Sequence, residues 1–260
     1  MSHRTWLVSL VVAGIITAAA SPASAQALET ETARVLPSGM LEAGAGVEVQ
    51  GSSEGTEAAS PLFVEIGIAD RFELVVEQVA MTRIKQNGAM SATGIGDLEL
   101  TAVGLVVPER GPWPALALAA ELKVPLAKNA LIGTGELDYT GYLILSKRVG
   151  RADLHANFGY AILGAPSGTT VNNIFNAAVA ATVEMNDRFD IYGEVYGNTT
   201  SSAKSTMGTI NPEFAGGELV GVLGASYRPA RWLSLSLGIS LDNNAAVLVH
   251  PGVTVYHPLF

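Results

Sequence analysis

The sequence contains no cysteine, so it has neither a disulfide framework nor a thiolate metal site. After residue 25 it also lacks any continuous apolar run of about 18 residues, which excludes membrane-spanning helices. Aromatic residues make up only 7% of the chain. Basic residues are scarce too: 15 Lys and Arg stand against 24 Asp and Glu, giving a formal net charge of −9. A chain this acidic is a poor partner for nucleic acid, and we expect none.

The start of the chain has the pattern of a cleavable export signal. A short polar beginning precedes an apolar stretch over residues 7–20, and small residues follow at Ala23 and Ala25. This small-x-small spacing is typical of a signal peptidase site. The apolar stretch is too short to cross a bilayer as a helix. We therefore expect a signal peptide at residues 1–25 and a single domain at residues 26–260.

Apolar residues make up 48% of the chain, and they are distributed by alternation in about twelve short segments. Residues 233–242 show it most cleanly, with Leu or Ile at every odd position and Ser or Gly at the even positions 234–240. Successive side chains of a strand point to opposite faces, so each segment predicts a strand with one apolar and one polar face. The expected strands cover residues 40–49, 62–68, 72–81, 96–107, 115–124, 137–149, 153–163, 174–184, 189–198, 218–227, 233–242 and a last strand ending at Phe260.

Long and short connections alternate between these segments, and the longest, residues 199–217, is rich in Ser, Thr and Gly. Outer-membrane barrels have short periplasmic turns and longer outward loops. The pattern therefore predicts an all-β protein of the cell outer membrane: a transmembrane antiparallel up-and-down β-barrel of about 12 strands with both termini periplasmic. In the last strand Tyr256 shares the parity of Phe260, and we expect both rings to face lipid.

Aromatic residues stand where the short turns enter strands. Phe72, Phe189 and Trp232 each follow an Arg directly, and Trp113 lies in the proline-rich turn at residues 108–114. Aromatic rings at the headgroup level anchor membrane proteins at the interface. We predict that Phe72, Trp113, Phe189 and Trp232 are interface anchors.

Few residues suggest catalysis. Gly94-Ile95-Gly96-Asp97 opens a strand instead of a helix, so it offers no helix N-terminus to a phosphate. His155 and Asn157 could belong to a hydrolase, but they fall on the polar face and no Gly-x-Ser-x-Gly pattern accompanies them. No His, Asp or Glu cluster has metal-ligand spacing. We expect no enzymatic activity, no catalytic residues, no cofactor and no metal.

The strongest chemical signal is acidic. On the parity argument, Lys123 and Arg148 are almost the only inward cations, whereas many carboxylates face inward. These inward acids are Glu42, Glu48, Glu65, Glu73, Glu77, Asp97, Glu99, Glu121, Asp138, Asp190, Glu194, Glu218 and Asp242. Carboxylates that line a pore favour cations over anions. We predict that four mid-strand acids line the lumen: Glu77, Glu99, Glu121 and Glu194.

Three stretches resemble a known family. Gly94-Ile95-Gly96-Asp97-Leu98 opens a strand, Leu116 to Pro125 is an apolar strand that ends in proline, and Leu137 to Tyr160 contains a Gly-Tyr strand after a long loop. Together they resemble the outer-membrane family named for the meta-pathway of phenol degradation. The resemblance implies a barrel associated with uptake of small hydrophobic or aromatic compounds.

The sequence thus predicts an outer-membrane channel or transporter for small solutes. Its expected partners are outer-membrane lipid, the barrel assembly machinery during biogenesis, and the solutes themselves. One alternative is a structural or adhesive barrel that transports nothing, with a lumen plugged by bulky side chains such as Tyr142, Tyr192 and Tyr196. A second is a soluble exported β-sandwich whose apolar faces pack on each other.

Overall fold

The structure is a computed structural model that describes residues 28, 30–88, 91–201 and 217–259. The expected signal peptide at residues 1–25 lies outside these residues, as does Phe260. No helix among the described residues is both long and apolar enough to cross a membrane.

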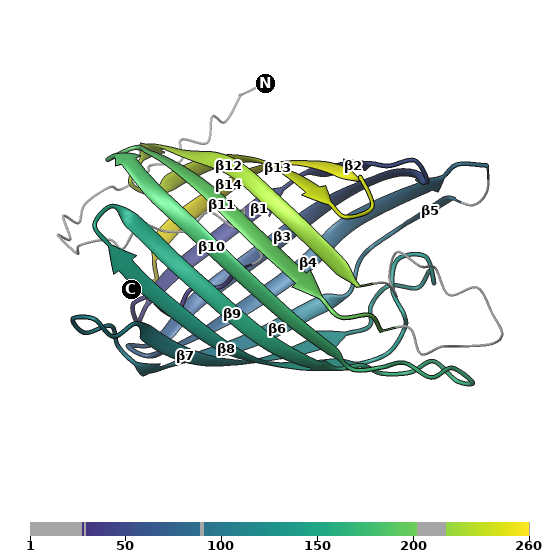
Figure 1. Ribbon diagram of the computed structural model, residues 1–260, viewed down its shortest axis with the longest axis horizontal. Coiled ribbons are helices and arrows are strands. Elements are labelled where there is room, and N and C mark those ends of the chain that lie inside the picture. The colour runs from purple at the N-terminus through teal and green to yellow at the C-terminus, as the bar shows by residue number, and fades with distance from the viewer. Residues whose placement is uncertain (1–27, 29, 89–90, 202–216, 260) are drawn as a thin grey trace, which may run out of the picture.

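The described residues form one closed antiparallel sheet (Figure 1). Apart from the two interrupted strands described below, each strand pairs with its neighbours in the chain, and β1 pairs with both β14 and β3, which closes the sheet. The strands are β1 (Met40–Gly46), β2 (Glu48–Gly51), β3 (Gly55–Ala69), β4 (Phe72–Gln86), β5 (Ser91–Gly94), β6 (Leu98–Val107), β7 (Ala115–Val124), β8 (Asp138–Val149), β9 (Ala152–Ile162), β10 (Ile174–Asn186), β11 (Phe189–Asn198), β12 (Glu218–Ala230), β13 (Leu233–Asp242) and β14 (Val247–Pro258).

Two pairs of these segments are single strands with an interruption. β1 and β2 are separated only by Val47 and share the partners β3 and β14. β5 and β6 are separated by residues 95–97 and both pair with β4. The barrel therefore has twelve antiparallel strands, which confirms the predicted all-β up-and-down barrel. Closed pairing leaves no sheet edge exposed, as hydrocarbon requires.

Burial along β13 confirms the predicted alternation. Leu235, Leu237 and Ile239 are exposed on the outside, whereas Ser234 and Ser240 are buried. Exposed large apolar side chains also occur on seven other strands, so the outer surface carries an apolar band: Leu74, Leu118, Leu143, Phe158, Val179, Val195 and Leu223. In water such a surface would be costly, but lipid solvates it.

Residues 51–60 and 82–93 lie outside the predicted strands but are largely strand, which corrects two boundaries. β3 and β4 stay paired from Gly67↔Glu73 out to Gly55↔Gln86. Backbone hydrogen bonds hold this extension beyond the apolar band. It therefore carries no apolar alternation by which the sequence could show it.

Tyr256 faces the lumen, so the prediction that it faces lipid is wrong. Its hydroxyl donates to Glu42 Oε1 at 3.0 Å, and Thr254, at the same parity of β14, is 2% exposed. Even-numbered residues of β14 thus point inward. A polar hydroxyl finds a carboxylate there and would find none in hydrocarbon.

Candidate functional site: the barrel lumen

Carboxylates from five neighbouring strands form a row on the inner wall. We call Glu42, Glu65, Glu77, Glu99 and Glu121 the acidic ladder. Glu42 opposes Glu65 across β1 and β3, and Glu77 opposes Glu99 across β4 and β6. Glu65 pairs with Val75, two residues before Glu77, and Glu99 pairs with Lys123, two residues beyond Glu121. Each carboxylate therefore has another as a direct or diagonal neighbour.

Hydroxyl groups bind the two ends of the acidic ladder. Tyr256 donates to Glu42 at one end, and Thr140 and Tyr142 donate to Glu121 at 3.2 Å each at the other. Like charges directly opposite each other across a sheet repel. A row of them inside a pore attracts cations and discourages anions.

The structure brings together three of the four predicted lumen-lining residues. Glu77, Glu99 and Glu121 lie on the adjacent strands β4, β6 and β7 within the acidic ladder. Glu194 lies apart from them on β11, is 4% exposed, and accepts a hydrogen bond from the Thr30 hydroxyl.

Three other inward acids, Asp97, Asp138 and Asp190, lie beside cations, and the sequence pattern predicts only one of the two cations, Lys123. Arg228 also faces inward, where its guanidinium binds Asp190 through both nitrogens. Lys123 binds Asp138 and lies 3.7 Å from Asp97. These pairs lie toward the two ends of the barrel.

The lumen also contains part of the chain itself. Residues 30–36, here called the N-terminal segment, run irregularly between side chains of the inner wall. Ala33 N–H donates to Ser146 Oγ at 2.8 Å on β8, and Leu36 N–H donates to Glu73 Oε2 at 2.5 Å on β4. With Thr30 at Glu194 on β11, the segment crosses from one side of the barrel to the other.

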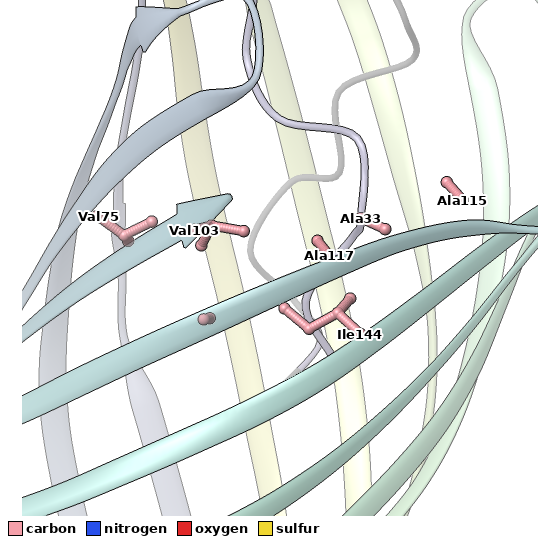
Figure 2. Close-up of a cluster of buried hydrophobic side chains, with 7 residues drawn as sticks. Ala33, Val75, Val103, Ala115, Ala117 and Ile144 are labelled. Atoms are coloured by element: carbon pink, nitrogen blue, oxygen red, sulfur yellow. The ribbon is translucent and has the colours of Figure 1, made fainter. Parts of the chain in front are cut away.

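An apolar patch on the inner wall receives Ala33, which is completely buried (Figure 2). The wall residues of this patch are Val75, Val103, Ala115, Ala117, Ala119 and Ile144. The alternation predicted a polar lumen and did not single out this patch. The three alanines on the inward face of β7 are the available signal, because small side chains leave room for another part of the chain.

Arg34 is the charged anchor of the N-terminal segment. Its guanidinium donates to both carboxylate oxygens of Asp153, at 2.7 and 2.8 Å, and to Glu109 Oε2 at 2.8 Å. Glu109, in the turn between β6 and β7, also binds Lys147 at 2.7 Å. Partial burial favours the neutral form of Glu109, but hydrogen bonds from Lys147, Arg34 and the Arg148 backbone outweigh it and lower its pKa from 4.5 to about 2.

Ser146, His155 and Asp153 lie close together, and two of them, Ser146 and Asp153, bind the N-terminal segment. Ser146 Oγ is 2.8 Å from His155 Nδ1, and His155 Nε2 is 3.7 Å from Asp153. Ser146 is 1% exposed beneath Ala33, and both oxygens of Asp153 bind Arg34. The N-terminal segment therefore covers Ser146, and Asp153 lies beyond hydrogen-bond distance of the His155 ring.

Asn157 also binds the N-terminal segment. It is buried, and in the amide orientation that satisfies both partners it binds the backbone N–H and C=O of Glu31. Among the described residues, no group of three or more His, Asp or Glu side chains could hold a metal ion.

The Gly94–Asp97 motif lies at the end of the barrel that carries the long loops, and it binds one of these loops. Gly96 N–H donates to Val79 C=O at 2.8 Å, where the strand is interrupted. Asp97 Oδ1 then accepts the backbone N–H groups of Leu126 and Ala127, at 3.0 and 2.9 Å. The motif thus fastens the loop after β7 to the barrel rim.

The four predicted interface anchors lie together at the end with the short turns. Trp113 is 73% exposed and Trp232 is 58% exposed, and Phe72 and Phe189 are exposed as well. Met40 pairs with Pro258 at this same end, so β1 begins and β14 ends there (Figure 1).

Comparison with known proteins identifies the family. A family profile described as "Putative MetA-pathway of phenol degradation" matches residues 32–247. The chain belongs to this family. Membership in this phenol-degradation family confirms the resemblance seen in the sequence, and the match begins inside the N-terminal segment. No curated protein matches the chain.

Solved structures of low sequence identity share the fold. The COG4313 outer membrane channel from Pseudomonas putida F1 has a TM-score of 0.71 at 12% identity, covering 88% of this chain and all of its own. KdgM porin in complex with disordered oligogalacturonate and NanC porin each have a TM-score of 0.56 at 10% identity, covering 82% of this chain and 98% of theirs. The fold is therefore that of outer-membrane β-barrels embedded in lipid.

Proposed function

We propose that this protein is an outer-membrane channel for small solutes and that its lumen favours cations over anions. The observation that carries the proposal is the acidic ladder, five carboxylates in a row across the inner wall of a closed barrel. Structural relatives that are channels and porins support the same role. The proposal includes export through a signal peptide cleaved after residue 25 and insertion by the barrel assembly machinery.

In the proposed orientation the short turns and both termini face the periplasm, as in other outer-membrane barrels. Phe72, Trp113, Phe189 and Trp232 would then mark the inner boundary of the outer membrane. The long loops, with the rim that Asp97 fastens, would face outward.

The phenol-degradation family suggests small aromatic compounds as solutes. Uncharged aromatic compounds fit the lumen better than aromatic carboxylates, because the acidic ladder repels anions. The apolar patch around Val75, Val103 and Ile144 offers a surface for a ring once the lumen is free.

Liposome swelling tests the proposed function. Vesicles containing the refolded protein should swell faster in an isotonic cationic amino acid than in an anionic one of similar size. The variant Glu77→Gln/Glu99→Gln should reduce this difference, and the rim variant Glu218→Gln should leave it largely unchanged. Equal swelling in both solutes would contradict the cation preference, and no swelling in either would contradict solute passage.

One observation favours a second candidate function, a structural barrel that transports nothing. The N-terminal segment occupies the lumen, as a permanent plug would. The two candidates differ in whether that segment can leave.

A further inference from the structure

We propose that the N-terminal segment, residues 30–36, is a built-in gate: seated, it restricts the lumen, and released from its Arg34 anchor, it opens the path along the acidic ladder. This inference rests on the proposed channel function. The residues that would restrict the lumen precede the first predicted strand, and the sequence pattern predicts no role for them.

The segment is placed to block the passage because its contacts span the cross-section. Thr30, the first residue of the segment, binds Glu194 on β11, and Leu28, which precedes the segment, packs against Tyr192, Val220 and Val222 on β11 and β12. At the other end Leu36 N–H binds Glu73 on β4, on the side of the acidic ladder. A solute passing along the barrel axis would meet the segment between these two walls.

The segment is attached in a way that permits release. Its backbone is irregular between residues 30 and 37, and hydrogen bonds to wall side chains such as Ser146 and Glu73 hold it. Leaving the lumen therefore breaks these side-chain contacts while the barrel's strand ladder stays whole. By contrast, removing any strand would break a row of backbone bonds on both sides.

The connection to β1 forms a natural hinge. Gly39 has φ 79°, a left-handed conformation that lets the chain turn from the lumen into β1. Gly39 N–H donates to Gly67 C=O at 2.8 Å. A Cβ at Gly67 would lie 2.1 Å from the Pro37 carbonyl oxygen, so the absent side chain lets the segment pass close over β3.

Arg34 is the latch of this gate. It bridges Asp153 on β9 and Glu109 in the β6–β7 turn, and the side chains of all three are at most 24% exposed. Both acids keep other cations nearby when Arg34 leaves, Lys147 at Glu109 and Arg148 at 3.9 Å from Asp153. These alternative partners lower the cost of release, because neither carboxylate is left buried and unpaired.

The absence of cysteine from the chain provides a direct test. Thr32 Oγ1 lies 3.4 Å from Ser146 Oγ, so the double variant Thr32→Cys/Ser146→Cys places two thiols where a disulfide can form between segment and wall. Refolded protein would be recorded as single channels in planar bilayers, first oxidised and then after reduction with dithiothreitol. The matched controls are the two single-cysteine variants under the same treatments.

The gate predicts that the oxidised channel loses its full openings and regains them on reduction, with no such change in either control. Arg34→Ala, which removes the latch without a crosslink, should increase the fraction of time spent fully open. Heat-modifiable migration on a gel would show that every variant remains a closed barrel.

Other outcomes separate the gate from the channel. Equal conductance before and after reduction, with the disulfide verified by mass spectrometry, would overturn the gate and leave the channel intact. Failure of the disulfide to form would mean that the segment does not sit against β8, which also overturns the gate. No conductance in any variant, Arg34→Ala included, would overturn both proposals.

Discussion

Leu237 and Ser236 are adjacent residues of β13 that point to opposite sides of the barrel wall. Leu237 is 53% exposed on the outer face, and Ser236 faces a lumen cavity that is also lined by Glu48 and His250. Arg at position 237 would place a charge in lipid, whereas Arg at position 236 would meet water and the Glu48 carboxylate.

The expected cost at Leu237 follows from its depth. It is four residues from the start of β13 at Leu233, which is about 13 Å along a strand. A tilt of about 40° makes that about 10 Å along the barrel axis, close to the middle of an apolar band about 25 Å tall. An Arg there costs about 2–4 kcal/mol, or about 30- to 700-fold in the ratio of folded to unfolded protein. Ser236→Arg should cost about 1 kcal/mol or less, as charges in solvated sites do.

Denaturant titration of both variants in lipid vesicles measures this difference. Trp113 and Trp232 report unfolding by fluorescence, and gel migration without boiling reports the closed barrel. The wild-type protein and Leu237→Ala serve as references, because alanine removes the leucine without adding charge. Equal destabilisation by the two Arg substitutions would refute the assignment of the faces.

Three further predictions concern the lumen and its rims. Neutralising the four predicted lumen acids to Gln should move the reversal potential in a salt gradient toward zero; the four are Glu77, Glu99, Glu121 and Glu194. The control variant Glu218→Gln should leave the potential unchanged. An unchanged potential in the fourfold variant would exclude these acids as the source of selectivity. Asp97→Ala should expose the loop at residues 125–136 to limited proteolysis, because it removes the acceptor for two backbone N–H groups. A cleavage rate equal to that of the wild-type protein would show that Asp97 does not hold the loop. The folded-state pKa of Glu109 is lowered to about 2, so its stabilisation is complete above pH 4.5 and is lost as pH falls toward 2. Denaturant titrations should therefore show the stability difference between wild type and Glu109→Gln shrinking over that range only, and a difference that shrinks between pH 7 and 5 would contradict the Arg34, Lys147 and Arg148 contacts.

The barrel was predictable because alternation and loop length are both local properties of the sequence. Alternation predicts the two faces of a strand, as in β13, where Leu235, Leu237 and Ile239 alternate with Ser234 and Ser240. Repetition of the same pattern along the chain predicts the barrel. The acidic ladder followed from the same parity, since Glu77, Glu99 and Glu121 each occupy a polar position.

The contents of the lumen were not predictable in the same way. Arg34 binds Asp153, 119 residues along the chain, and no periodic pattern marks such a contact. Arg228 lies beyond the predicted strand at residues 218–227, but β12 runs on to Ala230 and directs the Arg228 side chain inward to Asp190. The parity that Tyr256 shares with Phe260 predicts a lipid-facing ring, but pairing of β14 with β1 places its hydroxyl at Glu42 in the lumen.

The most direct test of the cation-favouring channel is the reversal potential of the refolded wild-type protein in planar bilayers under a KCl gradient. The acidic ladder predicts single-channel currents whose reversal potential has the sign of potassium permeation. A reversal potential with the sign of chloride permeation would contradict the account.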